Sequence, residues 1–306
     1  MPAAGFVTVD VFTRERFAGN PLAVFPDARG LSDELMQKIA AEFGYSEITF
    51  VLPPEDPSND ARVRIFTPTA EIPFAGHPNV GTAFVLGQQK ELFGKPIGSS
   101  LRFEELAGLV EIEVLRDQDA VVGATIRAPR QLDVGTTVPV DRVADCLCLS
   151  PDDVKVVRHQ PITVSVGLPF VAAELVNLDA LAKACPNISA FHRARDAAPE
   201  PGSDFSLFAY VRDPQDEGRV RARMFAPLDN VIEDPATGSA SAALGSYLAA
   251  QSGQADGTFS LVIQQGVEMG RPSEILLRVT LQDGRPSQVL ISGHCAMAMR
   301  GEIDSI

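Results

Sequence analysis

The sequence repeats a short pattern once in each half, and this repeat limits the possible folds more than any other feature. Arg64–Pro68 reads RIFTP, and Arg223–Pro227 reads RMFAP. A second echo follows in both halves. In the first half, His77 and Pro78 are followed after two residues by Gly81–Ala83. In the second half, Asp234 and Pro235 are followed after two residues by Gly238–Ala240. Internal similarity in a fixed order is typical of a duplicated structural unit.

A weaker third echo precedes the other two, since Gly19–Val24 resembles Gly167–Ala172. Three echoes in one order predict two similar domains, and a length of 306 residues suits two domains of ordinary size. Turn-forming residues over Ala128–Pro139 predict the boundary. We therefore expect a first domain over residues 1–129, with a C-terminal strand over 288–306 packing back on it, and a second domain over residues 130–287.

Short segments rich in β-branched and aromatic residues recur along the chain and predict many strands. The expected strands are Phe6–Phe12, Leu22–Phe25, Ile48–Leu52, Arg62–Phe66, Val110–Leu115, Ala124–Ala128, Ile162–Val166, Phe170–Leu175, Phe205–Val211, Arg221–Phe225 and Leu276–Thr280, with a closing strand pair over Val289–Arg300. Leu31–Phe43 predicts instead an amphipathic helix capped by Ser32, because its apolar residues recur every four positions.

A helix is also expected to begin at each repeated signature. The second of these, Thr237–Ala250, consists mainly of Gly, Ala and Ser, so that other backbone can approach it closely on several sides. A helix enclosed by a rolled sheet needs such a surface. The predicted fold class is α+β, with two pseudo-symmetric barrel-like domains that each wrap around a central helix.

Charge and composition exclude several classes of function. The formal net charge is -14, which argues against nucleic acid or an anionic membrane surface as a partner, because both need clustered Lys and Arg. No run of about 18 apolar residues occurs, and the N-terminal residues lack a secretory pattern, so we expect a cytoplasmic protein. The four cysteines and four histidines are scattered, which predicts neither a disulfide framework nor a metal site.

The repeated signature predicts two helix beginnings that could bind an anion. Proline favours the first helical position, so Pro78 and Pro235 are expected to place His77 and Asp234 at the N-caps. Unpaired N–H groups and the positive end of the helix dipole attract a carboxylate there, and the small residues Gly81, Gly238 and Ser239 allow close approach. Asp is also a common N-cap without any function, whereas His is a poor cap and needs another reason.

Glu47 is the third candidate, since it interrupts the run Tyr45–Leu52 that otherwise reads as a half-buried strand. If its side chain faces a cleft between the two halves, loss of solvent should raise its pKa toward neutrality. A carboxyl that both takes and returns a proton requires such a pKa. The alternative is a solvated charge at the start of a strand, and the residues alone leave both interpretations open.

Several motifs in one order resemble the PhzF-like isomerases of phenazine biosynthesis. The resemblance runs nearly end to end and rests on Phe17–Val24, Ser46, Glu47, Phe74–Pro78, Asp234–Ser239, Gln265, Gly266 and Met269–Ser273. It implies the diaminopimelate-epimerase fold, which agrees with the duplication. It also implies a cofactor-independent activity, the isomerisation of trans-2,3-dihydro-3-hydroxyanthranilate, a small carboxylate.

The same resemblance implies roles for particular residues. Glu47 would be the acid/base that moves the proton, while His77, Asp234 and Ser239 would bind and polarise the substrate. Five neighbouring residues are expected to contact the substrate: Gly76, Gly81, Thr82, Thr237 and Gly238. Epimerases of this fold use two cysteines, and neither signature here contains one, which favours a single carboxylate acting on one face of the substrate.

Two other classes of function compete with an isomerase. A binding protein could keep the fold and turn over nothing, although it would have no need of Glu47. A hydrolase using Ser239 or Ser46 as nucleophile is less consistent with the sequence, which has no Gly-x-Ser-x-Gly elbow. A homodimer is expected from the resemblance and from base rates among enzymes.

Overall fold

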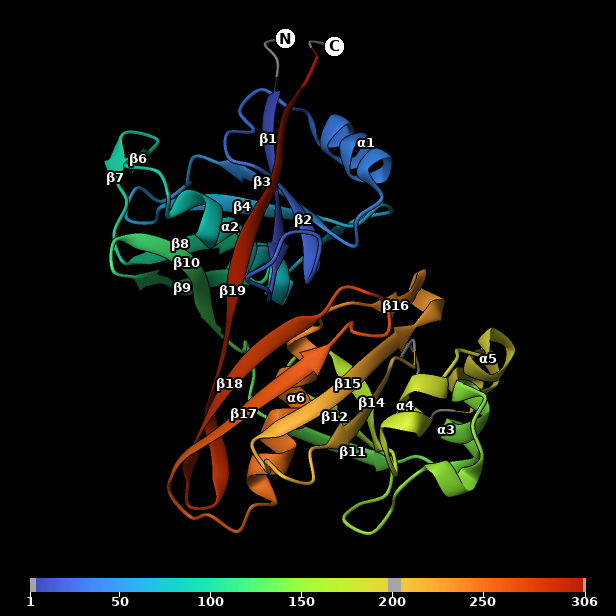
Figure 1. The fold of residues 1–306 in the computed structure, drawn as a ribbon. Helices are drawn as coiled ribbons and strands as arrows, with labels where there is room; N and C mark the ends of the chain where they lie inside the picture. The colour runs from blue at the N-terminus through green and yellow to red at the C-terminus, as the bar shows by residue number, and fades with distance from the viewer. Residues whose placement is uncertain (1–3, 198–204, 305–306) are drawn as a thin grey trace. The chain divides into compact units, whose positions relative to one another are not determined.

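The computed structural model describes residues 4–197 and 205–304, and its contacts divide the chain into two compact units (Figure 1). The first unit comprises residues 1–127 and 291–306, and the second comprises residues 128–290. The chain therefore returns to its first unit at the end, through the last part of strand β19 (Arg285–Ile303). The two units are described separately below.

A closed barrel forms the first unit. Its strands pair in the order β1, β2, β3, β4, β8, β9, β10 and β19, and β19 pairs with β1 to close the ring. Their bounds are β1 Ala4–Val11, β2 Asn20–Phe25, β3 Ile48–Leu52, β4 Ala61–Phe66, β8 Ser100–Glu105, β9 Gly108–Asp117 and β10 Ala120–Arg127. Short strands β5 (Glu71–Ile72), β6 (Glu91–Leu92) and β7 (Lys95–Pro96) lie outside this ring order. A ring of strands leaves no open sheet edge.

Helix α2 (Gly76–Leu86) is the central helix of the first unit. All of its residues are buried, and it packs against β1, β2, β3, β9 and β10. Gly81 makes this packing possible, because a Cβ at that position would lie 2.6 Å from the Leu22 side chain. A helix that is apolar on every side is stable only when it is enclosed.

The second unit repeats this architecture with different strands. Their bounds are β11 Asp133–Thr137, β12 Ile162–Ser165, β13 Pro169–Glu174, β14 Leu207–Arg212, β15 Arg219–Ala226, β16 Val231–Asp234, β17 Gly257–Gln265 and β18 Ser273–Gln282. From β12 to β18 the pairs alternate between antiparallel and parallel exactly as they do from β1 to β9 in the first unit. The predicted α+β fold of two similar, barrel-like halves is confirmed.

Helix α6 (Gly238–Ala250) is the central helix of the second unit. It packs against β12, β13, β17 and β18, and only Ser239 and Ala250 are not buried. Its small residues allow this, as expected: a Cβ at Gly245 would lie 2.6 Å from the Leu277 side chain. Ala and Gly therefore bring the helix and the sheet closer than larger residues would permit.

Peripheral helices cover each barrel on the outside. Helix α1 (Asp33–Phe43) follows the predicted bounds, and the Ser32 side chain accepts a hydrogen bond from the Leu35 N–H as its N-cap. Met36, Ile39 and Ala40 pack it into an aromatic-rich cluster. In the second unit the sequence pattern missed three short helices, α3 Val140–Leu147, α4 Leu178–Lys183 and α5 Ile188–Asp196. They share one buried cluster with β13 and β14, so packing stabilises them more than local propensity does.

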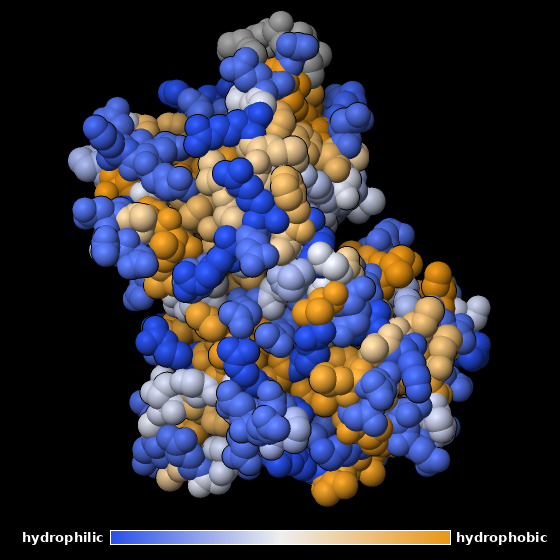
Figure 2. Space-filling view, viewed as in Figure 1, coloured by the Kyte–Doolittle hydropathy of each residue, from blue (hydrophilic) through white to orange (hydrophobic). Residues whose placement is uncertain are grey.

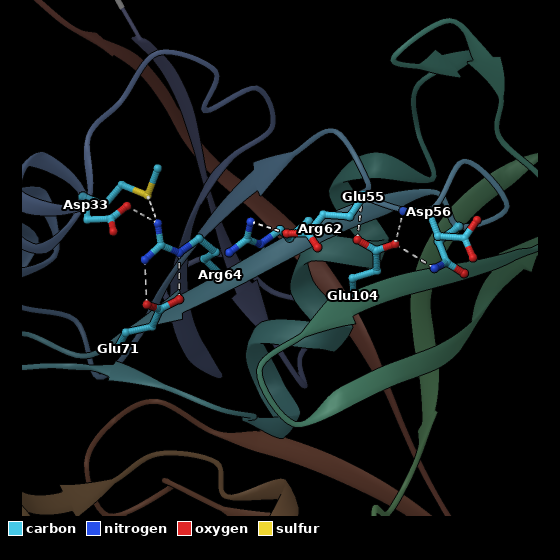
Figure 3. A network of polar contacts seen from close by, with 9 residues as sticks. Asp33, Glu55, Asp56, Arg62, Arg64, Glu71 and Glu104 are labelled. Carbon is cyan, nitrogen blue, oxygen red and sulfur yellow. Dashed lines mark hydrogen bonds and ion pairs between the residues drawn. The ribbon is translucent and has the colours of Figure 1, made fainter.

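The duplication extends to a repeated ion pair. In the first unit, Arg64 on β4 donates two hydrogen bonds to Glu71 on β5, at 2.7 and 2.6 Å, and also contacts Asp33 on α1 (Figure 3). In the second unit, Arg223 on β15 donates two hydrogen bonds to Glu233 on β16, at 2.7 and 2.8 Å. Each guanidinium also lies over the ring of a phenylalanine two residues later, at 5.0 and 4.8 Å from its centroid.

Two details of the predicted elements are wrong. The expected strand pair over Val289–Arg300 is one continuous strand, β19. No turn divides it, and Gly293 and Gly301 lie within the strand, where they pack against Phe12 and Phe6. The run after Glu47 is also more buried than a half-buried strand, since Ile48–Val51 has no exposed face.

Figure 2 shows hydrophilic residues spread over the visible face of the chain, with apolar residues between them. Among the described residues, none of the helices combines the length and the apolar composition that a membrane span needs.

Candidate functional site

Glu47 lies directly before strand β3, at the edge where the parallel strands β2 and β3 both begin. Ser46 precedes it, and the Ser46 hydroxyl donates to Asn20 Oδ1 at 3.5 Å, which links the two strand beginnings. The Glu47 side chain retains 19% of its exposed surface. Loss of solvent raises the pKa of this carboxyl above its ordinary value, and the neighbouring Ser46 partly opposes the shift.

His77 faces Glu47 from the first turn of α2. Its Nδ1 lies 3.7 Å from Glu47 Oε2, and only 6% of its side chain is exposed. This distance is longer than an ordinary hydrogen bond and falls within the range of an ion pair when the imidazole is protonated. A mostly buried carboxyl beside an imidazole is an arrangement that can serve proton transfer.

The predicted N-cap position of His77 is wrong. Helix α2 begins at Gly76, its N-cap is Ala75, and Pro78 is the third helical residue. Proline is tolerated throughout the first turn, because the N–H groups there have no intrahelical partner. His77 therefore lies inside the helix, where the turn fixes the direction of its side chain. A methyl side chain at the cap, that of Ala75, cannot accept from the first-turn N–H groups.

A second buried carboxyl lies near the same turn. Glu105, the last residue of β8, has a pKa raised to about 8 because burial penalises its charged form, and the neighbouring Asn79 side chain partly opposes this shift. Asn79 belongs to the first turn of α2, and its side chain donates to the Ala75 carbonyl at 3.0 Å. No sequence pattern indicates a role for Glu105, because a glutamate at the end of an alternating strand is expected to face solvent.

Asp234 ends strand β16 in the second unit and is 7% exposed. The expectation that it caps the helix is also wrong. Helix α6 begins at Gly238 with Thr237 as its N-cap, so Pro235 and Ala236 form a short connection between strand and helix. The Thr237 hydroxyl does not cap the helix but donates to Asp234 Oδ2.

Gln265 and Ser273 support this connection from strands β17 and β18. Gln265 contacts Thr237 and the Asp234 carbonyl, and the Ser273 hydroxyl contacts the Pro235 carbonyl at 2.9 Å. Both side chains are buried. They appeared in the sequence only as part of a motif near the C-terminus, and no local pattern indicates a contact with residues so far earlier in the chain.

The remaining candidates occupy the beginnings of the two central helices. Gly76 and Gly238 are the first helical residues of α2 and α6, and Ser239 is the partly exposed second residue of α6. Gly81 and Thr82 lie one turn further into α2. Gly81 packs against Leu22 and Val11, and the Thr82 hydroxyl is hydrogen-bonded to that of Thr49 at 2.8 Å. The structure thus gathers Glu47 and His77 in the first unit, and Asp234, Thr237 and Ser239 in the second.

A bound metal ion needs several donor side chains in one place. The residues that the structure describes include no group of three or more His, Cys, Asp or Glu side chains placed to bind one. All four cysteines are free.

Comparison with known proteins places these residues in context. The family model described as phenazine biosynthesis-like protein matches residues 9–301. An uncharacterized isomerase of Mesorhizobium japonicum is 37% identical over 308 residues, which is 99% of both chains. The trans-2,3-dihydro-3-hydroxyanthranilate isomerase of Pseudomonas aeruginosa is 37% identical over 303 residues, covering 97% of this chain and 98% of that protein. Among solved structures, a Bacillus anthracis phenazine biosynthesis protein of the PhzF family superposes with a TM-score of 0.88 at 27% identity and full coverage of both chains.

Proposed function

The chain belongs to the phenazine biosynthesis-like protein family and is an isomerase, and from this premise we propose that it moves a proton within a small carboxylate-bearing substrate. The substrate we propose is trans-2,3-dihydro-3-hydroxyanthranilate or a close analogue, as in the Pseudomonas relative. The proposed reaction needs no cofactor, because the group that takes the proton also returns it. Glu47 is that group.

One arrangement carries this assignment: the mostly buried Glu47 carboxyl lies 3.7 Å from His77 Nδ1, and burial raises the pKa of the carboxyl. An ordinary glutamate is a weak base and is almost fully ionised near neutral pH, so it cannot readily hold a proton between two steps. A raised pKa makes both the protonated and the ionised form accessible, as a shuttle requires. In its ionised form Glu47 removes a proton from one carbon, and in its protonated form it delivers that proton to another.

His77 is the proposed partner of Glu47. Its Nδ1 is 3.7 Å from the carboxylate, so its protonation state affects how readily Glu47 ionises. The first turn of α2 fixes the imidazole, and the neighbouring N–H groups of Gly76 and His77 favour a negative charge close by. His77 would therefore polarise the substrate, while its charge adjusts the affinity of Glu47 for the proton.

The second unit supplies the proposed groups for binding. Asp234 suits an amino or hydroxyl group of the substrate, and Ser239 suits a polar group beside it. The first N–H groups of α6, at Gly238 and Ser239, suit a carboxylate, which a chain of net charge -14 must bind through local donors. Gly76 and Thr237 complete the proposed binding residues, with Gly81 and Thr82 supporting α2 from one turn further in.

The experiment compares Glu47→Gln with Glu42→Gln in deuterated water, using trans-2,3-dihydro-3-hydroxyanthranilate as the substrate. Glu42 is exposed on α1 and serves as the matched control. We expect the wild-type chain and Glu42→Gln to convert the substrate, and Glu47→Gln to convert none. Deuterium reaches the receiving carbon only when protonated Glu47 exchanges with the solvent before it delivers the proton. Full turnover by Glu47→Gln would remove Glu47 from the reaction, and binding without any turnover in the wild type would favour a silent binding protein.

The homodimer and the cytoplasmic location remain predictions. Light scattering on the purified chain measures its mass in solution, and twice the mass of one chain is the expected result.

A further inference from the structure

Gln265 holds the residues around Asp234 from the end of strand β17, and its side chain is fully buried. Its Oε1 accepts a hydrogen bond from the Thr237 N–H at 3.0 Å. Its Nε2 donates to the Asp234 carbonyl at 2.7 Å and to the Thr237 hydroxyl at 3.0 Å. A single amide thus serves a donor and two acceptors of the connection between β16 and α6.

These contacts fix the orientation of the amide. If the Gln265 oxygen and nitrogen were exchanged, an N–H would face the Thr237 N–H and an oxygen would face the Asp234 carbonyl. Both contacts would be repulsive in a buried place, so only one arrangement is stable. The Thr237 hydroxyl oxygen therefore accepts a hydrogen bond from the Gln265 amide.

The direction of the Thr237 hydroxyl follows from this arrangement. A threonine hydroxyl has one proton, and since its oxygen accepts from Gln265, that proton is directed to Asp234 Oδ2. A donor aimed at a carboxylate oxygen stabilises the ionised form. The chain of hydrogen bonds from Gln265 through Thr237 thus both orients the Asp234 carboxylate and favours its negative charge.

The backbone of the connection is held from the same strands. The Ser273 hydroxyl lies 2.9 Å from the Pro235 carbonyl and 3.0 Å from the Gln265 carbonyl, either of which it can donate to. Gly266 follows Gln265 with a φ of +73°, and a Cβ there would lie 2.6 Å from the Pro235 carbonyl oxygen. Any side chain at position 266 would push the connection away, so this contact requires glycine.

We propose that Gln265 and Thr237 are positioning residues that hold Asp234 as a charged hydrogen-bond acceptor for the substrate. This inference rests on the role proposed for Asp234 above. Neither residue needs to touch the reacting atoms. Their effect is transmitted through the direction and the charge of one carboxylate.

Two matched pairs of variants test the proposal. Gln265→Met removes every side-chain hydrogen bond, whereas Gln264→Met changes the neighbouring, partly buried glutamine, which belongs to a different surface lined by Arg212 and Arg221. Thr237→Val removes only the hydroxyl and keeps the backbone bond to Gln265, whereas Thr237→Ser restores a hydroxyl. The second pair covers the case in which Gln265→Met does not fold.

In the isomerisation assay, we expect Gln265→Met and Thr237→Val to lower kcat/KM by about 10- to 100-fold, mainly through a higher KM. Gln264→Met should remain within about threefold of the wild type, and Thr237→Ser should recover most of the activity that Thr237→Val loses. A residue with only a structural role would lower the melting temperature and leave the KM of the folded enzyme unchanged. That result, or an equal KM for Thr237→Val and Thr237→Ser, overturns the proposal.

A wild-type chain that does not turn over this compound would refute the proposed substrate and not the positioning role. The role is then measured without substrate, by hydrogen exchange at the Thr237 amide and by crystal structures. We expect faster exchange at Thr237 in Gln265→Met than in Gln264→Met, and a rotated Asp234 carboxylate in both Gln265→Met and Thr237→Val. If the Asp234 carboxylate keeps its wild-type orientation in both crystal structures, the proposal is overturned.

Discussion

The two units share one scaffold but treat their buried carboxyl groups in different ways. In the first unit, burial raises the pKa of both Glu47 and Glu105, and the groups that oppose these shifts are the neutral Ser46 and Asn79. In the second unit, the carboxylate of Glu174 is 1% exposed and is accompanied by Lys155 Nζ at 3.0 Å and by Arg212 Nε at 3.7 Å.

The contrast continues at the repeated signature. His77 and Glu47 approach each other at 3.7 Å without the geometry of a hydrogen bond, whereas Thr237 donates directly to Asp234 and is itself held by Gln265. The repeated signature thus includes a helical His77 beside Glu47 in one unit, for which we propose proton exchange, and in the other unit Asp234 at the end of a strand, which we propose as a fixed acceptor. Duplication provides two equivalent places, and the local polar contacts decide what each can do.

The largest expected effect separates the proton carrier from the fixed acceptor. Glu47→Gln should lower kcat by about 10²- to 10⁴-fold with little change in KM, because it removes acid/base catalysis. Asp234→Asn should instead raise KM more than it lowers kcat, since the amide keeps the shape of the side chain but loses its charge. Steady-state kinetics on both variants measures the difference, and the same kcat and KM pattern in the two would break the comparison.

A second effect concerns the repeated ion pair. Arg223→Met should reduce the free energy of unfolding by about 3–5 kcal/mol. The variant leaves the largely buried Glu233 without its cationic partner, and it removes the hydrogen bonds to the carbonyls of Leu181 and Ala184 at the end of α4. Arg64→Met should cost less, about 1–3 kcal/mol, since its second partner Asp33 is mostly exposed. Urea unfolding of both variants measures the difference, and equal losses would show that the two copies are energetically equivalent.

The smallest expected effect depends on pH. Glu105 has a folded pKa of about 8, above its ordinary value of 4.5, so the folded state binds the proton more tightly than the unfolded state does. The contribution of Glu105 to the free energy of unfolding should therefore be largest below pH 4.5 and should fall as the pH rises toward 8. Glu105→Gln should stabilise the chain by about 1–3 kcal/mol at pH 9 and by almost nothing at pH 5.

The matched control for this effect is Glu174→Gln in the second unit. This carboxylate has cationic partners, so the variant should destabilise the chain at pH 9, opposite in sign to Glu105→Gln. Thermal unfolding at the two pH values checks both signs. A loss of stability from both variants would mean that the two units handle buried charge alike.

Much of the fold could be predicted because it depends on local patterns. Strand Ile48–Leu52 begins and ends where the sequence predicts, and helix α1 has its predicted N-cap. Both depend on signals that span only a few residues, namely a β-branched run and a serine before an apolar repeat. The predicted first residues of α2 and α6 are wrong because a proline can occupy several positions in the first turn of a helix or precede it. The choice among them depends on tertiary contacts, such as that between Gln265 and Thr237.

The candidate site shows the same limit. His77 and Glu47 could be named from their unusual place in a pattern, and the structure brings them together. Gln265, Ser273 and Glu105 could not be assigned a role, because what matters at these positions is burial and contact with distant residues. A glutamine at the end of a strand has the same local appearance whether it faces solvent or a buried connection.

We propose that the Glu47 carboxyl binds its proton more tightly in the folded chain than a glutamate exposed to water does. A ¹³C NMR titration of the Glu47 side-chain carboxyl in the wild-type chain, assigned by comparison with Glu47→Gln, measures this directly. We predict a midpoint clearly above the ordinary value of 4.5 for a glutamate. A midpoint at or below that value would contradict the account, because the carboxyl would then be an ordinary ionised side chain with no proton to deliver.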